Sequence, residues 1–472
     1  MVKLFFVTNS LRPNINFTLL NRFLSRDKNL QPQYFNFPKK TSKKKFLEKF
    51  STRMANKSFD LGNNSENFLS WLLVNNVYVY NKSTWGRPPH PCVVSNDTTD
   101  EGQSSGKGLL AYKNIQQGEK LIEIPLNLAL SKEHPLNKFM FGNIETFNEY
   151  DLLAIFLIQQ RSIGDKSFWN NYFKILPKET DLDLFFRWTI FDSFFLKGSK
   201  INSASIYLRE KIRSQFFRIN NQVFKQNSIL FPKTLYNIET WEWALSVLFS
   251  RAIFLQNFKK LTLVPYADFL NHNPFSTSYI DAKEIPFSEF LEITMYADKP
   301  YNKFDQVFTT YGPKTNLELL LLYGFILERN PFDSTEIRVG LSPKDNFRDS
   351  KKFFLFSCEK TEMITFPLFY YQYPKELYEF LRLCLNIPDK HFENNGQFDF
   401  DNNLDFGLEK IIKQVITKTC QKNLQNFHYF KNEKKSQKLI ENELFFSKTQ
   451  KIAFKQIKCE KKILKKIIDS SN

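Results

Sequence analysis

Two stretches of this sequence are the most informative about its fold: VPYADFLNHNP at residues 264–274 and FTTYGPKTNLELLLLYGFI at residues 308–326. The first stretch carries Asn271 and His272 directly after an apolar turn. An amide and an imidazole both donate and accept hydrogen bonds, so this pair can hold a ligand or complete a turn. The second stretch places Tyr311 after an expected strand, where its hydroxyl group can point into a cleft or find a partner in the core.

The segment after Tyr311 predicts a short helix that is marked at both ends. Thr315 and Glu318 have the spacing of a capping box at its start. Gly324 stands where a helix commonly ends, because glycine tolerates the left-handed conformation of that position. Tyr323 then lies in the last turn of this helix.

An upstream stretch, GKGLLAYKNIQQGEKLIEIP at residues 106–125, predicts a small β unit with a strand at Leu121–Pro125. Gly106 and Gly108 have no side chains, so a ligand can approach the backbone closely there. The pair lacks the spacing of a dinucleotide-binding loop, and alone it also fits a plain turn. The segment before it, Ser95–Ser105, is polar, and we expect it to be a loop.

The composition is that of a globular protein with room for two or three domains. The chain has 472 residues, of which 42% are hydrophobic and 24% charged. No apolar run approaches the ~20 residues that a membrane-spanning helix needs, so we expect no membrane insertion. The five cysteines and five histidines show no metal-binding spacing, so we expect no metal site.

The net charge of +17 is concentrated at the two ends of the chain. Residues 1–58 carry 13 basic against 2 acidic residues, and residues 410–472 carry 16 against 5. Residues 59–409 have a balance of −5. The body therefore lacks the basic surface of a nucleic-acid-binding domain, and we expect no nucleic-acid partner. The composition of residues 1–58 is typical of an organellar transit peptide; a disordered basic arm, or sequence upstream of an internal start at Met54, fits it as well.

Helical periodicity dominates two regions, one from about Glu145 to Trp243 and one after about Asp345. In the second region the apolar spacing predicts several helices. The last of them would present a lysine-rich outer face, comprising Lys461, Lys462, Lys465 and Lys466.

Together, these motifs resemble the SET-domain protein methyltransferases of the Rubisco large-subunit methyltransferase-like branch, and plant plastid-type members are the most similar. SFWNNYFKILP at 167–177 and FSRAIFL at 249–255 belong to the same pattern, which runs from about Ser65 to the C-terminus. The resemblance implies an α+β fold, with a SET-domain β core that contains a pseudoknot. The expected parts are a targeting or disordered segment at 1–58, the SET domain at 59–335 with a helical insert at about 135–248, and an all-helical substrate-binding domain at 336–472.

The resemblance also implies S-adenosylmethionine as cofactor, a protein substrate, and roles for particular residues. Tyr311 would be the catalytic tyrosine. The cofactor would contact Gly106, Lys107, Gly108, Leu109, Asn271, His272, Tyr311 and Tyr323. The substrate would contact Ser250, Arg251, Asp268 and Tyr323. In one departure from the family pattern, Ser105 stands where members often have a glutamate before the first glycine.

The implied activity is methylation of a lysine in a non-histone protein, with the Rubisco large subunit or another organellar protein as candidate substrate. Two other readings stay open: methylation of histidine, and an inactive SET-type binding module. We further expect a monomer located in an organelle, a plastid ahead of a mitochondrion, with the cytoplasm as the alternative.

Overall fold

The computed structural model describes residues 63–79, 89–100, 103–132, 147–182, 184, 186, 188–189, 196–284, 291–345, 347–357, 361–370, 373–385, 406–427 and 447–471. These residues all belong to one compact unit, Leu61–Asn472. The expected targeting segment, 1–58, lies outside the described residues.

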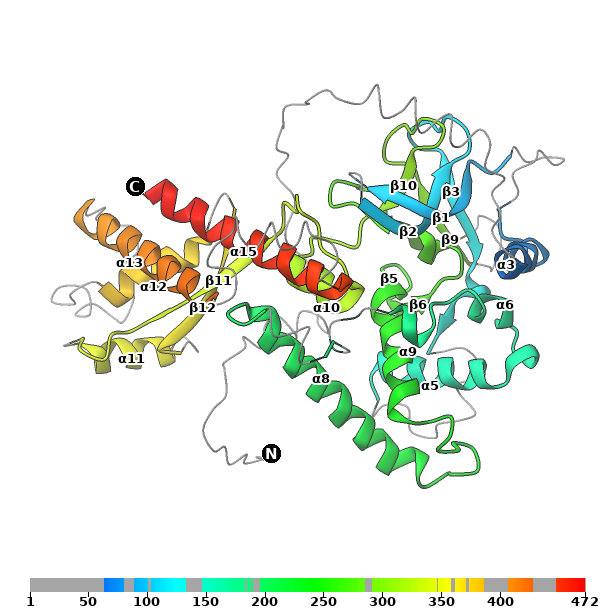
Figure 1. Ribbon diagram of the computed structural model, residues 1–472, viewed down its shortest axis with the longest axis horizontal. Coiled ribbons are helices and arrows are strands. Elements are labelled where there is room, and N and C mark those ends of the chain that lie inside the picture. Colours follow the sequence, from blue (N-terminus) through cyan, green and yellow to red (C-terminus); the bar gives the residue numbers. More distant parts are fainter. Residues whose placement is uncertain are drawn as a thin grey trace. The chain divides into compact units, whose positions relative to one another are not determined.

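The described chain alternates short strands with helices (Figure 1). The helices are α3 (Asn63–Val74), α5 (Glu149–Ser162), α6 (Asn170–Phe173), α8 (Lys200–Ile219), α9 (Ile238–Arg251), α10 (Asn316–Tyr323), α11 (Arg348–Ser357), α12 (Lys375–Leu385), α13 (Phe406–Gln425) and α15 (Lys448–Ser471). The strands are β1 (Cys92–Asp100), β2 (Gln103–Ala111), β3 (Lys120–Pro125), β4 (Leu130–Ser131), β5 (Ile253–Leu255), β6 (Lys260–Leu263), β7 (Asn271–His272), β8 (Asp281–Glu284), β9 (Leu291–Tyr296), β10 (Gln306–Thr309), β11 (Ser334–Gly340) and β12 (Met363–Phe369).

The strands form small sheets rather than one large sheet. One sheet has the order β1-β2-β10-β7, a second β3-β9-β8, a third β4-β6-β5, and β11 pairs with β12. Strands that are distant in the sequence are therefore neighbours in space. In the first sheet β10 is antiparallel to β2, with Val307 opposite Leu109.

The pairing of β7 with β10 joins the stretch at residues 264–274 to the stretch at residues 308–326. It is parallel, with Phe308 opposite Asn271 and Thr309 opposite His272. The backbone N–H of Asn273 extends the contact by donating to the Thr309 carbonyl at 3.0 Å. Parallel strands usually need a helical crossover between them. Here the connecting chain instead forms β8 and β9, which pair with each other and with β3 in another sheet. The threading of a pseudoknot through this region stays a prediction.

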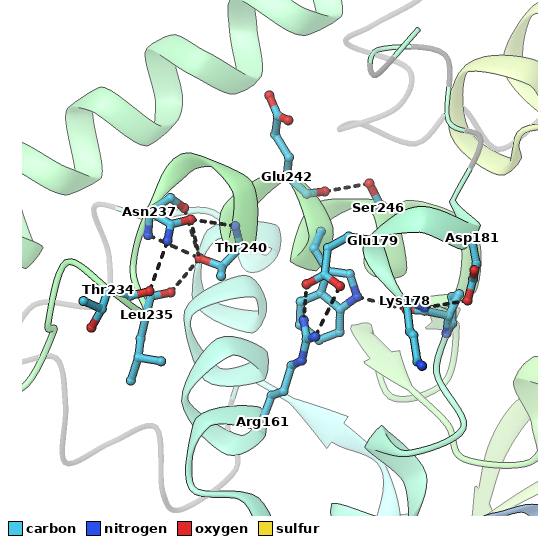
Figure 2. Close-up of polar contacts among 12 residues, drawn as sticks. Arg161, Lys178, Glu179, Asp181, Thr234, Leu235, Asn237, Thr240, Glu242 and Ser246 are labelled. Carbon is cyan, nitrogen blue, oxygen red and sulfur yellow. Dashed lines mark hydrogen bonds and ion pairs between the residues drawn. The ribbon is translucent and has the colours of Figure 1, made fainter.

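Helix α9 is capped at its start by Asn237 and ends at Arg251. The side chain of Asn237 accepts from the Thr240 N–H at 3.0 Å, and the Thr240 hydroxyl faces the Asn237 N–H at 3.2 Å (Figure 2). Trp243 is buried in the next turn, where its indole donates to the Pro177 carbonyl at 3.0 Å. Arg161 lies over the Trp243 ring at 4.0 Å from its centroid. This anchoring sets the position of Arg251, the last residue of the helix.

The short helix α10 forms as its sequence predicts. Thr315 and Glu318 make both hydrogen bonds of a capping box, and Gly324 ends the helix with a φ of 77°. Asn316, its first residue, is fully buried and holds both carboxylate oxygens of Asp333, each at 2.9–3.0 Å. These bonds fix the segment that returns from the end of α10.

Two expectations about secondary structure are wrong. Ser95–Ser105 is not a loop, because β1 and β2 pair through most of it, with a register shift between Ser95 and Thr98. Thr98 is buried there although the segment as a whole is polar. The region after residue 335 is largely helical, but not wholly so, because β11 and β12 pair along seven residues each. Buried Ile337, Val339 and Leu368 give these strands an apolar face that the helices cover.

In the part of the chain that the structure describes, no helix is both long and apolar enough to cross a bilayer.

Candidate functional site

The glycine stretch of β2 forms a tight contact with Asn271. The Asn271 amide nitrogen donates to the Lys107 carbonyl at 3.1 Å and to the Thr98 hydroxyl oxygen at 3.2 Å. The Thr98 hydroxyl donates in turn to the Gly106 carbonyl at 2.9 Å. A Cβ atom at Gly108 would lie 2.8 Å from the Asn271 nitrogen, so only glycine fits at this position. Both hydrogens of the amide are used, and its oxygen is left as an acceptor.

Three aromatic rings stack beside this contact. The His272 and Tyr311 rings are 5.0 Å apart at 17°, and the Tyr311 and Tyr323 rings are 4.8 Å apart at 23°. His272 comes from β7, Tyr311 follows β10, and Tyr323 ends α10. The pairing of β7 with β10 and the length of the capped helix α10 therefore bring together residues that lie far apart in the sequence.

The hydrogen bonds of His272 define which of its nitrogens carries the proton. Its Nδ1 accepts from the Tyr311 backbone N–H at 3.1 Å, so in the neutral ring the hydrogen is on Nε2. Burial lowers the pKa of His272 to about 4, which keeps the ring neutral at physiological pH. Nε2 is buried and has no hydrogen-bond partner among the described residues. The site thus offers one buried N–H donor to a ligand.

The Tyr311 hydroxyl group is held in one orientation. It donates to the Leu270 carbonyl at 2.7 Å, so its proton is engaged and its oxygen lone pairs remain as acceptors. Burial raises the pKa of Tyr311 well above its ordinary value of 10, and the same holds for Tyr323. A tyrosine that stays protonated can position a reacting group through its oxygen but cannot act as a strong base.

A buried ionic cluster joins the end of α9 to the turn before β7. Arg251 Nη1 lies 3.1 Å from Asp268 Oδ2 and 3.2 Å from the Asp268 carbonyl. The Tyr172 hydroxyl donates to the same carboxylate oxygen at 2.9 Å. Burial raises the pKa of Asp268, and the charge of Arg251 and the bond from Tyr172 oppose that rise. Asp268 Oδ1 and Arg251 Nε are buried without a hydrogen-bond partner in the described structure, so each can still bind a ligand.

The Asp268 turn includes an unusual backbone conformation. Tyr266, just before it, has a φ of 78°, which is rare for a residue other than glycine. Its side chain is buried, with its ring 6.3 Å from that of Phe269. Strain of this kind persists only where the surrounding packing fixes it, and it is common at ligand sites.

The Ser250 side chain is engaged within its own helix, so its backbone carbonyl is the group left to meet a ligand. Its hydroxyl donates to the Ser246 carbonyl at 2.8 Å, within α9 itself. Because Ser250 and Arg251 are the last two residues of α9, their carbonyls have no partner within the helix. The negative end of the helix dipole also favours a positively charged or donating group here, such as an amine.

Lys107 lies half-buried between the two glycines and close to the ionic cluster. Burial lowers the pKa of Lys107, the charge of Arg251 lowers it further, and Asp268 acts in the opposite direction. Leu109 is completely buried, so it can contact a ligand only through its backbone. Ser105, which stands where a glutamate is common in the family pattern, is half-buried.

The structure brings the candidate residues into two connected groups. Contacts join Lys107, Gly108, Asn271, His272, Tyr311 and Tyr323 in one group and Arg251 with Asp268 in the other. Sequence reasoning missed Thr98 and the part played by Tyr172. Thr98 was hidden in a segment expected to be a loop. Tyr172 lies within the SFWNNYFKILP motif at 167–177, but nothing in the sequence pairs it with Asp268.

Among the described residues there is no cluster of three or more His, Cys, Asp or Glu side chains that could hold a metal ion.

Comparison with known proteins agrees with this architecture. The family model for the SET domain matches residues 106–312. The [fructose-bisphosphate aldolase]-lysine N-methyltransferase of Arabidopsis thaliana is 27% identical over 382 residues, covering 78% of this chain and 76% of that protein. The Rubisco large-subunit N-methyltransferase of Pisum sativum is 27% identical over 338 residues, covering 69% of this chain and 68% of that protein.

A solved structure of Rubisco LSMT bound to AdoMet superposes with a TM-score of 0.68 at 23% identity, covering 87% of this chain and 92% of that one. This likeness shows the fold, which confirms the α+β SET architecture. Residues 106–312 are a SET domain, and the chain that carries it is similar to the Rubisco large-subunit methyltransferase branch.

Proposed function

We propose that this chain is an S-adenosylmethionine-dependent protein-lysine N-methyltransferase that acts on a non-histone protein. The observation that carries the proposal is the stack of His272, Tyr311 and Tyr323 next to Asn271. A fixed tyrosine hydroxyl, a buried N–H donor and an amide acceptor lie close together there, which supports the proposal. The lysine methyltransferases among the relatives favour this activity.

The residues present fit S-adenosylmethionine. The cofactor carries a purine with acceptor nitrogens, an ammonium group and a carboxylate. His272 Nε2–H can donate to an acceptor, and the Asn271 oxygen can accept from an ammonium group. Arg251 Nε, buried and without a partner among the described residues, can bind a carboxylate. When bound, the cofactor supplies a methyl group activated by a sulfonium centre.

The protein must also present a neutral lysine amine in line with the methyl group of the cofactor. A free lysine has a pKa of ~10.4, so little of it is neutral near pH 7, and a desolvated site shifts it toward the neutral form. The Tyr311 oxygen and the carbonyls of Ser250 and Arg251 can accept hydrogen bonds from that amine. Holding reactants in near-attack geometry can supply about 7–11 kcal/mol of the barrier. Tyr311 acts here by positioning and electrostatics, since its own proton is bound to Leu270.

The decisive test uses purified protein, labelled S-adenosylmethionine and lysate of the source organism, with Tyr311→Phe as the control. We expect one or a few labelled proteins with the wild type and almost none with the variant. Mass spectrometry of the labelled peptide then separates lysine from histidine methylation. If calorimetry detects no S-adenosylmethionine binding, the chain is instead an inactive SET-type module and the proposal is wrong.

We further propose that residues 59–335 form the catalytic domain and that residues 336–472 bind the protein substrate, the enzyme acting as a monomer. Residues 1–58 would direct it to a plastid, which their basic composition and the chloroplastic relatives favour. A fluorescent fusion of the full chain tests the localisation, and a cytoplasmic signal would contradict targeting to a plastid. A chain beginning at Ser58 should keep full activity.

A further inference from the structure

The exposed face of the last helix carries a stripe of lysines. Helix α15 has 24 residues, and Lys451, Lys455, Lys458, Lys462 and Lys466 recur along it at intervals of three or four residues. This spacing places them on one side of an α-helix. Lys458, Lys462 and Lys466 are exposed, as is Lys465 beside them. We call Lys458, Lys462, Lys465 and Lys466 the α15 stripe.

The opposite face of α15 is buried, which fixes the direction of the stripe. Ala453, Ile457 and Leu464 are at most 1% exposed, and α13 packs against this face. Lys461 belongs to this side: it is 7% exposed, and its ammonium lies 5.8 Å from the centre of the Phe427 ring. The expectation that Lys461 contributes to the outer face is therefore wrong, because the helix rotates it toward α13.

The stripe has almost no acidic residues on its own helix. The acidic residues of α15 are Glu460, which is buried and accepts from Ser199 at 2.6 Å, and Asp469. A typical solvated helix face mixes both signs of charge, which limits its field. From Lys458 to Lys466 the stripe is about 12 Å long, at about 1.5 Å per residue. That is enough to meet several carboxylates at once.

The inner end of α15 lies close to the SET core. Lys455 is 3.6 Å from Glu328, which follows the end of α10 at Tyr323 by five residues. The buried bond from Ser199 to Glu460 ties the same helix to the start of α8. The stripe thus extends from a segment that is anchored to the core, so a molecule bound along it would be held at a defined place relative to the stacked rings.

We infer that the α15 stripe is a docking surface for an acidic region of the protein substrate. The inference rests on the proposed function for the identity of the partner. An acidic protein surface is favoured over a nucleic acid because residues 59–409 have a net charge of −5, which disfavours a long polyanion beside the stripe. Charges of this kind mainly speed encounter and fix orientation, and their effect falls with salt.

The test compares two variants with the same change of net charge. K458E/K462E/K466E reverses the stripe, and K410E/K413E/K418E reverses three exposed lysines of the neighbouring helix α13. A labelled short peptide rich in Asp and Glu is titrated by fluorescence anisotropy at low and at physiological salt. We expect the stripe variant to weaken binding roughly tenfold at low salt, and less at physiological salt, because exposed charge pairs are weak and screened. The α13 variant should weaken it clearly less.

Each outcome decides the inference. Equal losses in both variants would mean that only total charge matters, and no loss in the stripe variant would mean that the stripe does not bind. Single-stranded RNA that binds more tightly than the peptide, through the same lysines, would also overturn it. Calorimetry with S-adenosylmethionine tests the proposed function separately: both variants should bind it as the wild type does. If the wild type does not bind S-adenosylmethionine, the proposed function is wrong. The result of the peptide titration would not be affected.

Discussion

The contact between Gly108 and Asn271 gives a sharp test of the cofactor site, through Gly108→Ala. The new Cβ atom would lie 2.8 Å from the Asn271 nitrogen and 2.9 Å from Thr98 Cγ2 and Oγ1. Asn271 must move, and we expect both of its bonds, of 3.1 and 3.2 Å, to be lost. At about 0.5–1.5 kcal/mol for each neutral hydrogen bond, the loss is about 1–3 kcal/mol. If Asn271 holds the cofactor, its dissociation constant should rise by about 5- to 150-fold.

Calorimetric titration with S-adenosylmethionine measures this change, and circular dichroism checks that the variant is folded. Gly118→Ala is the matched control. It introduces the same methyl group at a φ of 80°, where no other atom lies within 4 Å. The control should lose stability through backbone strain of about 1–2 kcal/mol and bind the cofactor normally. A folded Gly108→Ala protein with wild-type affinity would refute the reasoning, because the amide would then not position the cofactor.

Three further changes test other parts of the site. Tyr311→Phe should nearly abolish methyl transfer while leaving cofactor affinity almost intact, and near-normal turnover would rule out its positioning role. Tyr172→Phe removes a donor to the buried Asp268 carboxylate, so the free energy of unfolding should fall by about 1–3 kcal/mol; an unchanged urea midpoint would contradict this. The pKa of His272 is lowered from 6.5 to about 4, so protonation favours the unfolded chain, and stability should be lost as the pH falls from about 6.5 to about 4. His272→Asn should lack this part of the pH dependence, up to about 3 kcal/mol, and identical urea-unfolding profiles for both proteins would show that His272 is not its source.

The sequence predicted local structure well wherever one segment carries the whole signal. Thr315 and Glu318 predict the start of the helix from Asn316 to Tyr323, and Gly324 predicts its end. The structure confirms the capping box and the terminal glycine. Motif resemblance grouped Asn271, His272, Tyr311 and Tyr323, and the structure stacks the rings of the last three against one another. Their role in holding a cofactor stays a prediction. Their stacking follows from the pairing of β7 with β10.

The parts that were missed depend on contacts between distant segments. Thr98 is buried because β2 covers it and Asn271 reaches it, which a polar local sequence cannot reveal. The bond from Tyr172 to Asp268 spans 96 residues. For Lys461, the spacing of the apolar residues predicted a helix correctly but did not show how far around it the buried face extends. A lysine at the edge of such a face can bury its stem and place its charge over an aromatic ring.

The parallel pairing of β7 with β10 has a consequence for how the protein is made. The residues of β7 emerge from the ribosome before those of β10, and all of β8 and β9 must be synthesised between them. Non-local pairings of this kind form late in folding, because the loop between them must close first. A nascent chain that ends before Gln306 therefore carries Asn271 and His272 without their partner strand β10 and without Tyr311 or Tyr323. We expect such a chain not to bind the proposed cofactor, S-adenosylmethionine, so that binding would begin only after the residues through Tyr323 have left the ribosome.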